Sequence, residues 1–247
     1  VAAGSVVYDV ELNGGGTITN AVTFANTGTL QIGNSNTDNM LFTNGFVALT
    51  GQSALTFGGT IRTTNTAISI GDADTDSTLT ADTTFNTQGG AALTINGDVA
   101  GAGNSLTLNS TGTTNITTLA TMTGLSSLTV SAGVTQIKAD ITTTGNQVYN
   151  GAVTYFGDIT LTGANVQFAS TVTKNATTDT LAIAVGNLNL DGAADVEALT
   201  VAEEANFADD VTAVTSITVS DKTTIENNQT VTLTSDSGGT GGISLEE

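Results

Sequence analysis

The sequence predicts an all-β fold, a right-handed parallel β-helix (a β-solenoid) with about 18–20 residues in each coil. Three observations lead to this fold: one stretch is written twice, short apolar alternations recur throughout, and Gly, Asn and Asp clusters separate them. Threonine makes up roughly a fifth of the chain, and helix formers are scarce, so almost no helix is expected.

The repeated stretch covers residues 30–61 and returns at residues 68–99, thirty-eight positions later. Ile32 and Ile70 are one of its matching pairs, and a third, weaker copy begins at Leu106. Self-similarity at a fixed offset is the signature of repeat architectures. Interpreted as two coils, the offset predicts a coil of about 19 residues.

In each short alternation, two apolar residues are separated by a single residue, which is the pattern of a strand with one buried face. Gly, Asn and Asp clusters between them end each strand early, so we expect strands of about three to five residues. The apolar pairs are Leu30/Ile32, Leu55/Phe57, Ile68/Ile70, Leu93/Ile95, Leu106/Leu108, Leu128/Val130, Ile159/Leu161, Leu188/Leu190, Leu199/Val201, Ile217/Val219 and Val231/Leu233.

In the second half a large apolar residue is followed four positions later by a branched one, as in Phe207 and Val211. That step needs a bend, which three short strands per coil would supply. Leu199 and Ile217 are 18 residues apart. We therefore expect about 12 or 13 coils and a rod on the order of 60 Å long. The alternative is one or more β-sandwich domains, which also have closely spaced strands.

The chain has a net charge of −19, with only four basic residues and no cysteine or histidine. This charge argues against binding to nucleic acid or to anionic lipid, because both require Lys and Arg. No apolar stretch is long enough to span a bilayer, so membrane insertion is not expected. An acidic surface of this kind suits divalent cations, and Ca²⁺ is the first ligand to suspect.

Three carboxylates alternate in the segment Asp72, Asp74 and Asp76, which in an extended chain would point to one side and could bind Ca²⁺. The segment lacks the turn glycine and the bidentate Glu of an EF-hand loop. The simpler interpretation is a solvated, charged corner. Two coils earlier, by the expected coil length, the equivalent corner would be residues 34–38, which carry Asn34, Asn36 and Asp38.

A second acidic region has no basic residue within it and is either an exposed face or a cation-dependent contact surface. Its members are Asp191, Asp195, Glu197, Glu203, Glu204, Asp209 and Asp210.

Catalysis is not expected, because without His or Cys the chain has no Ser/His/Asp triad, thiol nucleophile or ordinary zinc site. The segments 36–38 and 208–210 are similar to two motifs of polygalacturonases, but we expect them to lie too many coils apart to act together. Alternating threonines also suggest ice binding, although their pattern does not hold one register along the sequence. β-Propensity with a polar outer face explains them more simply.

Residues 144–154 and 158–168 resemble the "TGxQxYNGAV…LTG…VxF" repeats of filamentous-haemagglutinin-like bacterial surface proteins. The overall composition is also similar to that of solenoid S-layer proteins that assemble with calcium. The resemblance covers residues 144–172 closely and implies a β-helix that is secreted or held at a bacterial or archaeal cell surface, as a stalk, adhesin or matrix component.

The two ends of the chain are where we expect subunits to associate. We expect residues 1–235 to form one solenoid body that opens with a strand at Val6–Leu12, and residues 236–247 to form a Gly-rich linker and a short strand. That strand could complete a neighbouring subunit by strand addition, giving head-to-tail polymers. The leading hypothesis is therefore a structural, extracellular β-solenoid of a surface filament, matrix or S-layer. The alternative is an adhesin or stalk segment that binds glycan or a host surface.

Overall fold

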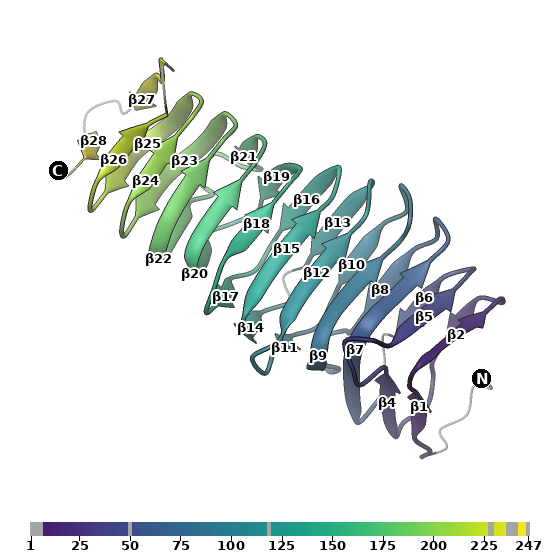
Figure 1. The fold of residues 1–247 in the computed structure, drawn as a ribbon. Helices are drawn as coiled ribbons and strands as arrows, with labels where there is room; N and C mark the ends of the chain where they lie inside the picture. Colours follow the sequence, from purple (N-terminus) through teal and green to yellow (C-terminus); the bar gives the residue numbers. More distant parts are fainter. Residues whose placement is uncertain (1–6, 49–50, 118–119, 227–229, 236–241, 246–247) are drawn as a thin grey trace.

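The computed structural model describes residues 7–48, 51–117, 120–226, 230–235 and 242–245. Within these residues the chain has no helix and forms one 28-stranded sheet in which every paired strand is parallel to its neighbours. The strands wind into a β-solenoid of about ten turns, with β1–β3 at one end of the rod and β26–β28 at the other (Figure 1). The predicted β-solenoid is confirmed, and the β-sandwich alternative is wrong.

Each coil contributes one strand segment to each of three stacks, which we name faces 1, 2 and 3. Face 1 contains β1 (Val10–Leu12), β4 (Thr29–Ile32), β11 (Val99–Ala100), β14 (Met122–Leu125), β17 (Ile141–Thr143) and β28 (Ile243–Leu245). Face 2 contains β2 (Gly15–Ile18), β5 (Asn39–Phe42), β12 (Ser105–Asn109), β15 (Ser127–Ser131), β18 (Gln147–Tyr149), β24 (Ala205–Phe207) and β26 (Thr223–Ile225). Face 3 contains β3 (Val22–Thr23), β6 (Phe46–Ala48), β8 (Ile68–Ile70), β10 (Leu93–Ile95), β13 (Thr113–Ile116), β16 (Val134–Ile137), β19 (Ala152–Tyr155), β21 (Val172–Lys174) and β27 (Leu233–Ser235).

Six longer strands bend around a corner and serve two faces. Faces 1 and 2 share β7 (Ala54–Thr63), β9 (Ser77–Asn86), β20 (Ile159–Phe168) and β22 (Leu181–Leu190). Faces 3 and 1 share β23 (Ala194–Val201) and β25 (Val211–Val219). The prediction of three strand segments per coil is therefore confirmed, but the expected strand length of three to five residues is wrong for these six strands, which have 8–10 residues because they continue around a corner.

The core is a set of columns of inward-facing side chains that run along the rod. Ten of the eleven apolar pairs predicted from the sequence lie on strands with both members buried. In the eleventh pair Leu233 lies on β27, whereas Val231 precedes it. The first coils are filled by Phe24, Phe42, Phe46, Phe57 and Phe85, whose rings contact one another at centroid distances of 4.8–6.2 Å. Burial of these columns is the main favourable term in folding.

Several polar side chains occupy core columns, among them Ser77, Thr83, Thr114 and Thr135, and the largest of them is Gln147. Gln147 is fully buried, between Leu128 and Val166 in register on face 2. Its Nε2 donates to the carbonyl oxygens of Ile141 (3.1 Å) and Thr162 (2.9 Å), and its Oε1 accepts from the Tyr149 hydroxyl at 2.9 Å. Burial raises the pKa of Tyr149, so its hydroxyl keeps the proton that it donates. The Gln147 amide and the Tyr149 hydroxyl are thus satisfied, as a buried amide requires.

The coil length differs from the prediction in much of the chain. Partner residues in the first coils are 20–25 positions apart, as in Val10 with Leu30 and Leu30 with Leu55. The predicted spacing of 18–20 holds in the middle of the rod, where Leu128 pairs with Gln147 and Val134 with Ala152, and again near the C-terminal end, where Leu199 pairs with Ile217. With about ten turns rather than 12 or 13, stacking at ~4.8 Å gives a rod of about 50 Å.

The thirty-eight-residue copy is not two coils. Ile32 lies on face 1, where it pairs with Phe57, whereas Ile70 lies on face 3 and pairs with Ala48 and Ile95. The two copies therefore sit on different faces. This is possible because all three faces use the same inward and outward alternation, so one stretch of sequence can serve on any of them.

The two predicted end segments are partly described. β1 covers only Val10–Leu12 of the strand expected at Val6–Leu12, and Val6 lies outside the described residues. The predicted terminal strand is present as β28 and pairs in parallel with β25 of its own chain. Of the Gly-rich linker, residues 238–241 lie outside the described residues.

Candidate functional site

The predicted calcium ligands lie in the corner between β8 and β9. Residues 72–75 form a tight turn closed by an antiparallel bridge between Asp72 and Thr75, and the backbone N–H of Asp74 donates to Asp72 Oδ1 at 3.0 Å. The expectation that this segment is extended is therefore wrong, because residues 72–75 turn the chain back on itself before Asp76. Among the described residues, no three or more carboxylates gather in a way that could hold a metal ion.

The segment that we expected to be equivalent lies elsewhere. Residues 34–38 form the corner between faces 1 and 2, whereas residues 72–76 form a corner between faces 3 and 1. Asp38 is only 7% exposed, and its Oδ2 accepts the backbone N–H of Asn34 at 2.8 Å, which lowers the pKa of that carboxyl. The carboxylate of Asp38 thus closes a turn.

Asn36 and Asp82 fasten this corner to later coils. Asn36 Nδ2 donates to Asp82 Oδ2 (3.3 Å), and the Asp82 backbone N–H donates to Asn36 Oδ1 (3.1 Å). Asp82 Oδ1 also accepts the backbone N–H of Ser105 at 2.8 Å, and this bond lowers the pKa of the carboxyl. These carboxylates act as structural hydrogen-bond acceptors between coils.

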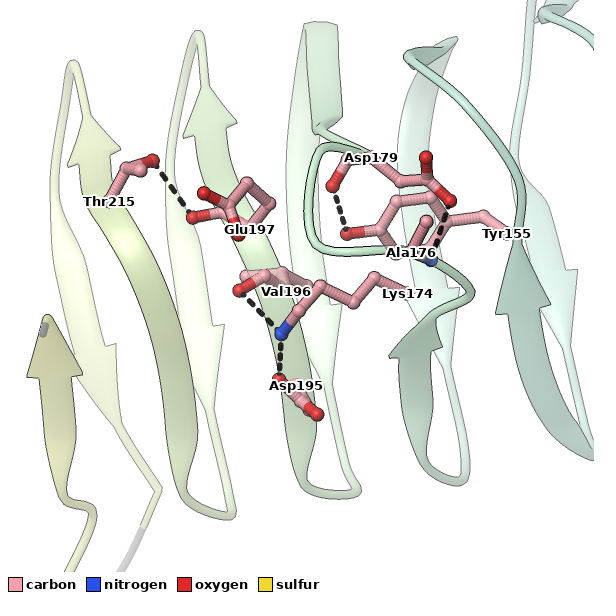
Figure 2. Close-up of polar contacts among 8 residues, drawn as sticks. All are labelled: Tyr155, Lys174, Ala176, Asp179, Asp195, Val196, Glu197 and Thr215. Atoms are coloured by element: carbon pink, nitrogen blue, oxygen red, sulfur yellow. Dashed lines mark hydrogen bonds and ion pairs between the residues drawn. The ribbon is translucent and has the colours of Figure 1, made fainter.

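The second acidic region gains a cation that the sequence does not show near it. Lys174, on β21, forms an ion pair with Asp195 on β23, and its Nζ also donates to the carbonyl oxygen of Val196 at 3.3 Å (Figure 2). The Lys174 side chain is 10% exposed and that of Asp195 is 56% exposed. The signal that could have revealed the pair is their separation of 21 residues, about one coil.

A tyrosine and two more carboxylates surround this ion pair (Figure 2). The Tyr155 hydroxyl donates to the backbone carbonyl oxygen of Asp179 at 3.1 Å. Burial raises the pKa of Tyr155, and the charges of Asp179, Asp195 and Glu197 raise it further, so the phenol stays neutral. Asp179 Oδ2 accepts the backbone N–H of Ala176 at 2.9 Å. The cluster joins neighbouring coils and has no activated nucleophile.

A groove lies on the outer side of face 2 near the C-terminal end. It has a volume of about 200 Å³ and is lined by Asn165, Asn187, Leu188, Asn189, Glu204, Ala205, Asn206 and Thr224. The polar members come from β20, β22, β24 and β26 and from the corner before β24. Sequence reasoning missed this groove, because its residues are 17–22 positions apart and meet only through the strand register.

Threonine columns are more regular than the sequence suggested. Thr60, Thr84, Thr107 and Thr129 are partners in register on four successive coils of face 2. On the next coil Val148 takes this position, and Gln167 and Asn189 follow. The column shows that the outer face changes from hydroxyl to amide groups along the rod.

The comparisons with known proteins add no relative: no family model, no curated protein and no solved structure matches the chain. In the described part of the chain, no helix is long and apolar enough to cross a membrane. The two segments that are similar to polygalacturonase motifs lie between β4 and β5 and between β24 and β25. Stacking places them roughly 40 Å apart, far beyond the ~5–9.5 Å between the paired carboxyl groups of glycosidases.

Proposed function

We propose that the protein is a structural β-solenoid subunit that associates end to end in an extracellular filament, matrix or S-layer. One observation carries the proposal: the two end coils differ from all others in how well they cover their apolar side chains. Inward-facing residues between them are almost fully buried, whereas Ile225, Ile243 and Leu245 at the C-terminal end are 41–43% exposed. Val10 and Leu12 at the other end are only partly buried.

The strand edges support the same proposal. Within the residues that the structure describes, β1, β2 and β3 each pair with one strand, as do β26, β27 and β28. Such edges are templates for pairing with another chain, and proteins that remain monomeric usually cover them. Every pairing within the sheet is parallel, so a second copy placed end to end would continue the same ladder.

The shapes of the two end coils favour a second copy as the partner. Ile225 belongs to the inward column that contains Met40 near the start of the rod, and Gly16 is the first member of that column. A glycine there leaves the space above Met40 open. Ile225 of one copy would fill this space in the next, as knobs fill holes in packed cores.

The position of β28 changes the assembly model that the sequence suggested. Because β28 is already seated on β25 of its own chain, it provides a docking edge rather than an arm to be exchanged. A net charge of −19 opposes contact between copies, so association should strengthen as salt screens the repulsion.

The test compares two substitutions on one strand. Ile225→Asp places a charge on the end of the stack, whereas Thr224→Asp places the same charge on its outer side. We expect the unmodified chain and Thr224→Asp to lengthen with protein concentration and salt, measured by sedimentation velocity and negative-stain microscopy, and Ile225→Asp to remain a monomer. A chain that stays monomeric under all conditions, or equal assembly of the two variants, would contradict the proposal. Repeating the series in chelator tests whether Ca²⁺ takes part in assembly.

A further inference from the structure

The groove on face 2 is built from amide side chains that the parallel register aligns. Asn165 is the partner of Asn187, and Glu204 follows them one coil later. A second column contains Gln167, Asn189, Asn206 and Thr224. Because successive coils stack at ~4.8 Å, the groove presents a regular ladder of amide oxygen and nitrogen atoms.

Part of the hydrogen-bonding capacity of this ladder is used within the protein. Asn206 Nδ2 donates to Asn189 Oδ1 at 3.1 Å and to Glu226 Oε1 at 2.7 Å. Asn187 Oδ1 accepts the backbone N–H of Glu204 at 3.3 Å. These bonds fix the orientation of three side chains, and they determine which amide atoms stay available.

The remaining capacity has no partner in the part of the chain that the structure describes. Asn206 Oδ1 is buried and accepts no hydrogen bond. The NH₂ groups of Asn187 and Asn189 donate to no other described residue. Asn189 Oδ1 already accepts a hydrogen bond from Asn206, and Asn187 Oδ1 accepts one from the backbone of Glu204. The buried Asn206 Oδ1 is out of reach of a ligand, so the NH₂ groups of Asn187 and Asn189 are the atoms left to bind one, and they favour a ligand that accepts hydrogen bonds.

Charge and composition narrow the class of ligand. The groove contains Glu204 and the chain carries a net charge of −19, which disfavours sulfated or uronic polymers. The lining is mainly polar and has no aromatic ring, so an apolar ligand has little to contact. The groove has the volume of about six or seven water molecules, and one sugar ring would displace them. Hydroxyl groups match the donors and acceptors of amides.

We propose that this groove binds a neutral oligosaccharide that runs along the rod, with successive sugar hydroxyls accepting hydrogen bonds from the side-chain NH₂ groups of Asn187 and Asn189. Without aromatic stacking, affinity depends on hydrogen bonds made by several coils at once, so longer oligosaccharides bind more tightly than monosaccharides. The site lies on the side of the rod, and its occupation does not depend on end-to-end association. A matrix or surface filament with such a face would hold polysaccharide along its length.

The probes are cellotetraose, chitotetraose and maltotetraose, with polygalacturonate as the anionic comparison. Binding is measured by calorimetry and by shifts of the side-chain amide resonances in nuclear magnetic resonance spectra. We expect at least one neutral probe to shift the resonances of Asn187, Asn189 and Asn206. The double substitution Asn187→Ala with Asn189→Ala should weaken that binding at least tenfold.

The matched control is Thr107→Ala with Thr129→Ala, in the same outward column several coils away, which should bind as the unmodified chain does. The proposal is overturned if none of the three neutral probes shifts these resonances at millimolar concentration. It is also overturned if the Asn187/Asn189 variant binds as tightly as the control, or if polygalacturonate binds as tightly as the neutral probes.

Discussion

The first and last coils of the rod form the same three faces with different numbers of residues. In the coil that begins at Leu199 each face takes three residues and each corner takes three, which gives the 18-residue return to Ile217. In the coil that begins with β4, the corner 33–38 alone takes six residues, and Leu30 returns at Leu55 after 25. Coil length is therefore a property of the corners, because corners can lengthen outward while the faces stay in register.

The interiors of the two regions differ as well. Each of these coils has six inward-facing residues, but the early coil uses Leu, Ile, Met, two Phe and Ala, whereas the late coil uses Leu, two Val, two Ala and Phe. The early core thus holds a cluster of aromatic rings, and the late core is aliphatic around Phe207. The early coils gain stability from ring contacts, while the late coils depend on close stacking of small residues.

The largest expected effect tests this difference directly. Phe46→Ala and Phe207→Ala each empty a fully buried site, and either should cost about 3–5 kcal/mol of unfolding free energy. Phe46 should cost more, because its ring contacts Phe24, Phe42 and Phe57 at 5.7, 4.8 and 6.1 Å. Urea unfolding monitored by hydrogen exchange would measure both. An equal or larger loss at Phe207 would show that ring contacts add nothing to the early coils.

A smaller effect tests whether the corners between faces 1 and 2 stack alike in both regions. Gly33 and Gly186 have positive φ angles, and a Cβ on either would lie 1.9 Å from the carbonyl oxygen of Gly58 or Gly163. Alanine at each should cost about 2–4 kcal/mol from overpacking and left-handed strain. Gly157→Ala, with positive φ but open space around it, is the control and should cost only about 1–2 kcal/mol. Thermal unfolding midpoints would rank the stability of the three variants. If Gly157→Ala lowered the midpoint as much as the other two, close contact between the backbones of neighbouring coils would not explain the loss.

The smallest effect concerns acid. The pKa values of Asp9, Asp38 and Asp82, all in the first coils, are lowered by hydrogen bonds from the backbone of Thr29, Asn34 and Ser105. A folded-state pKa below the ordinary 3.8 stabilises the fold above that pH, and this contribution is lost as pH falls through the lowered value. We therefore expect the early coils to lose hydrogen-exchange protection first below about pH 4.

Asp82→Asn should flatten this pH dependence, because its side chain no longer titrates. Asp74→Asn removes the same charge from an exposed turn position and should leave the pH dependence unchanged. Early loss of protection at the C-terminal end, or identical profiles for the two variants, would show that these hydrogen bonds do not determine acid stability.

The β-solenoid fold could be predicted from the sequence because inward-facing apolar residues occur at every second position, which is the period of a strand. Ten apolar pairs were placed on buried strands from that period alone, and the spacing of Leu199 and Ile217 gave the true coil length where corners are short. It failed where corners are long: a six-residue turn such as 33–38 adds to the spacing without changing any inward-facing column. The copies at Ile32 and Ile70 were assigned to one stack for the same reason, although they lie on different faces.

The functional residues were harder to predict. The run Asp72, Asp74 and Asp76 suggested that three side chains converge on one side of an extended chain, but residues 72–75 form a turn closed by Asp72 and Thr75. The groove residues Asn189 and Asn206 carry no local motif, and they meet only through the register between β22 and β24. Contacts made across coils are set by register, and a spacing that varies from coil to coil does not reveal them.

All three faces have the same alternation of inward and outward residues. A coil could therefore stack on the rod one face out of step and still bury its apolar residues. Gln147 makes that error costly. Only in the native register do its amide and the Tyr149 hydroxyl meet each other and the carbonyl oxygens of Ile141 and Thr162. A slipped coil would enclose these polar groups without partners, at a cost of several kcal/mol. We therefore expect the buried amide to disfavour a coil that stacks one face out of step.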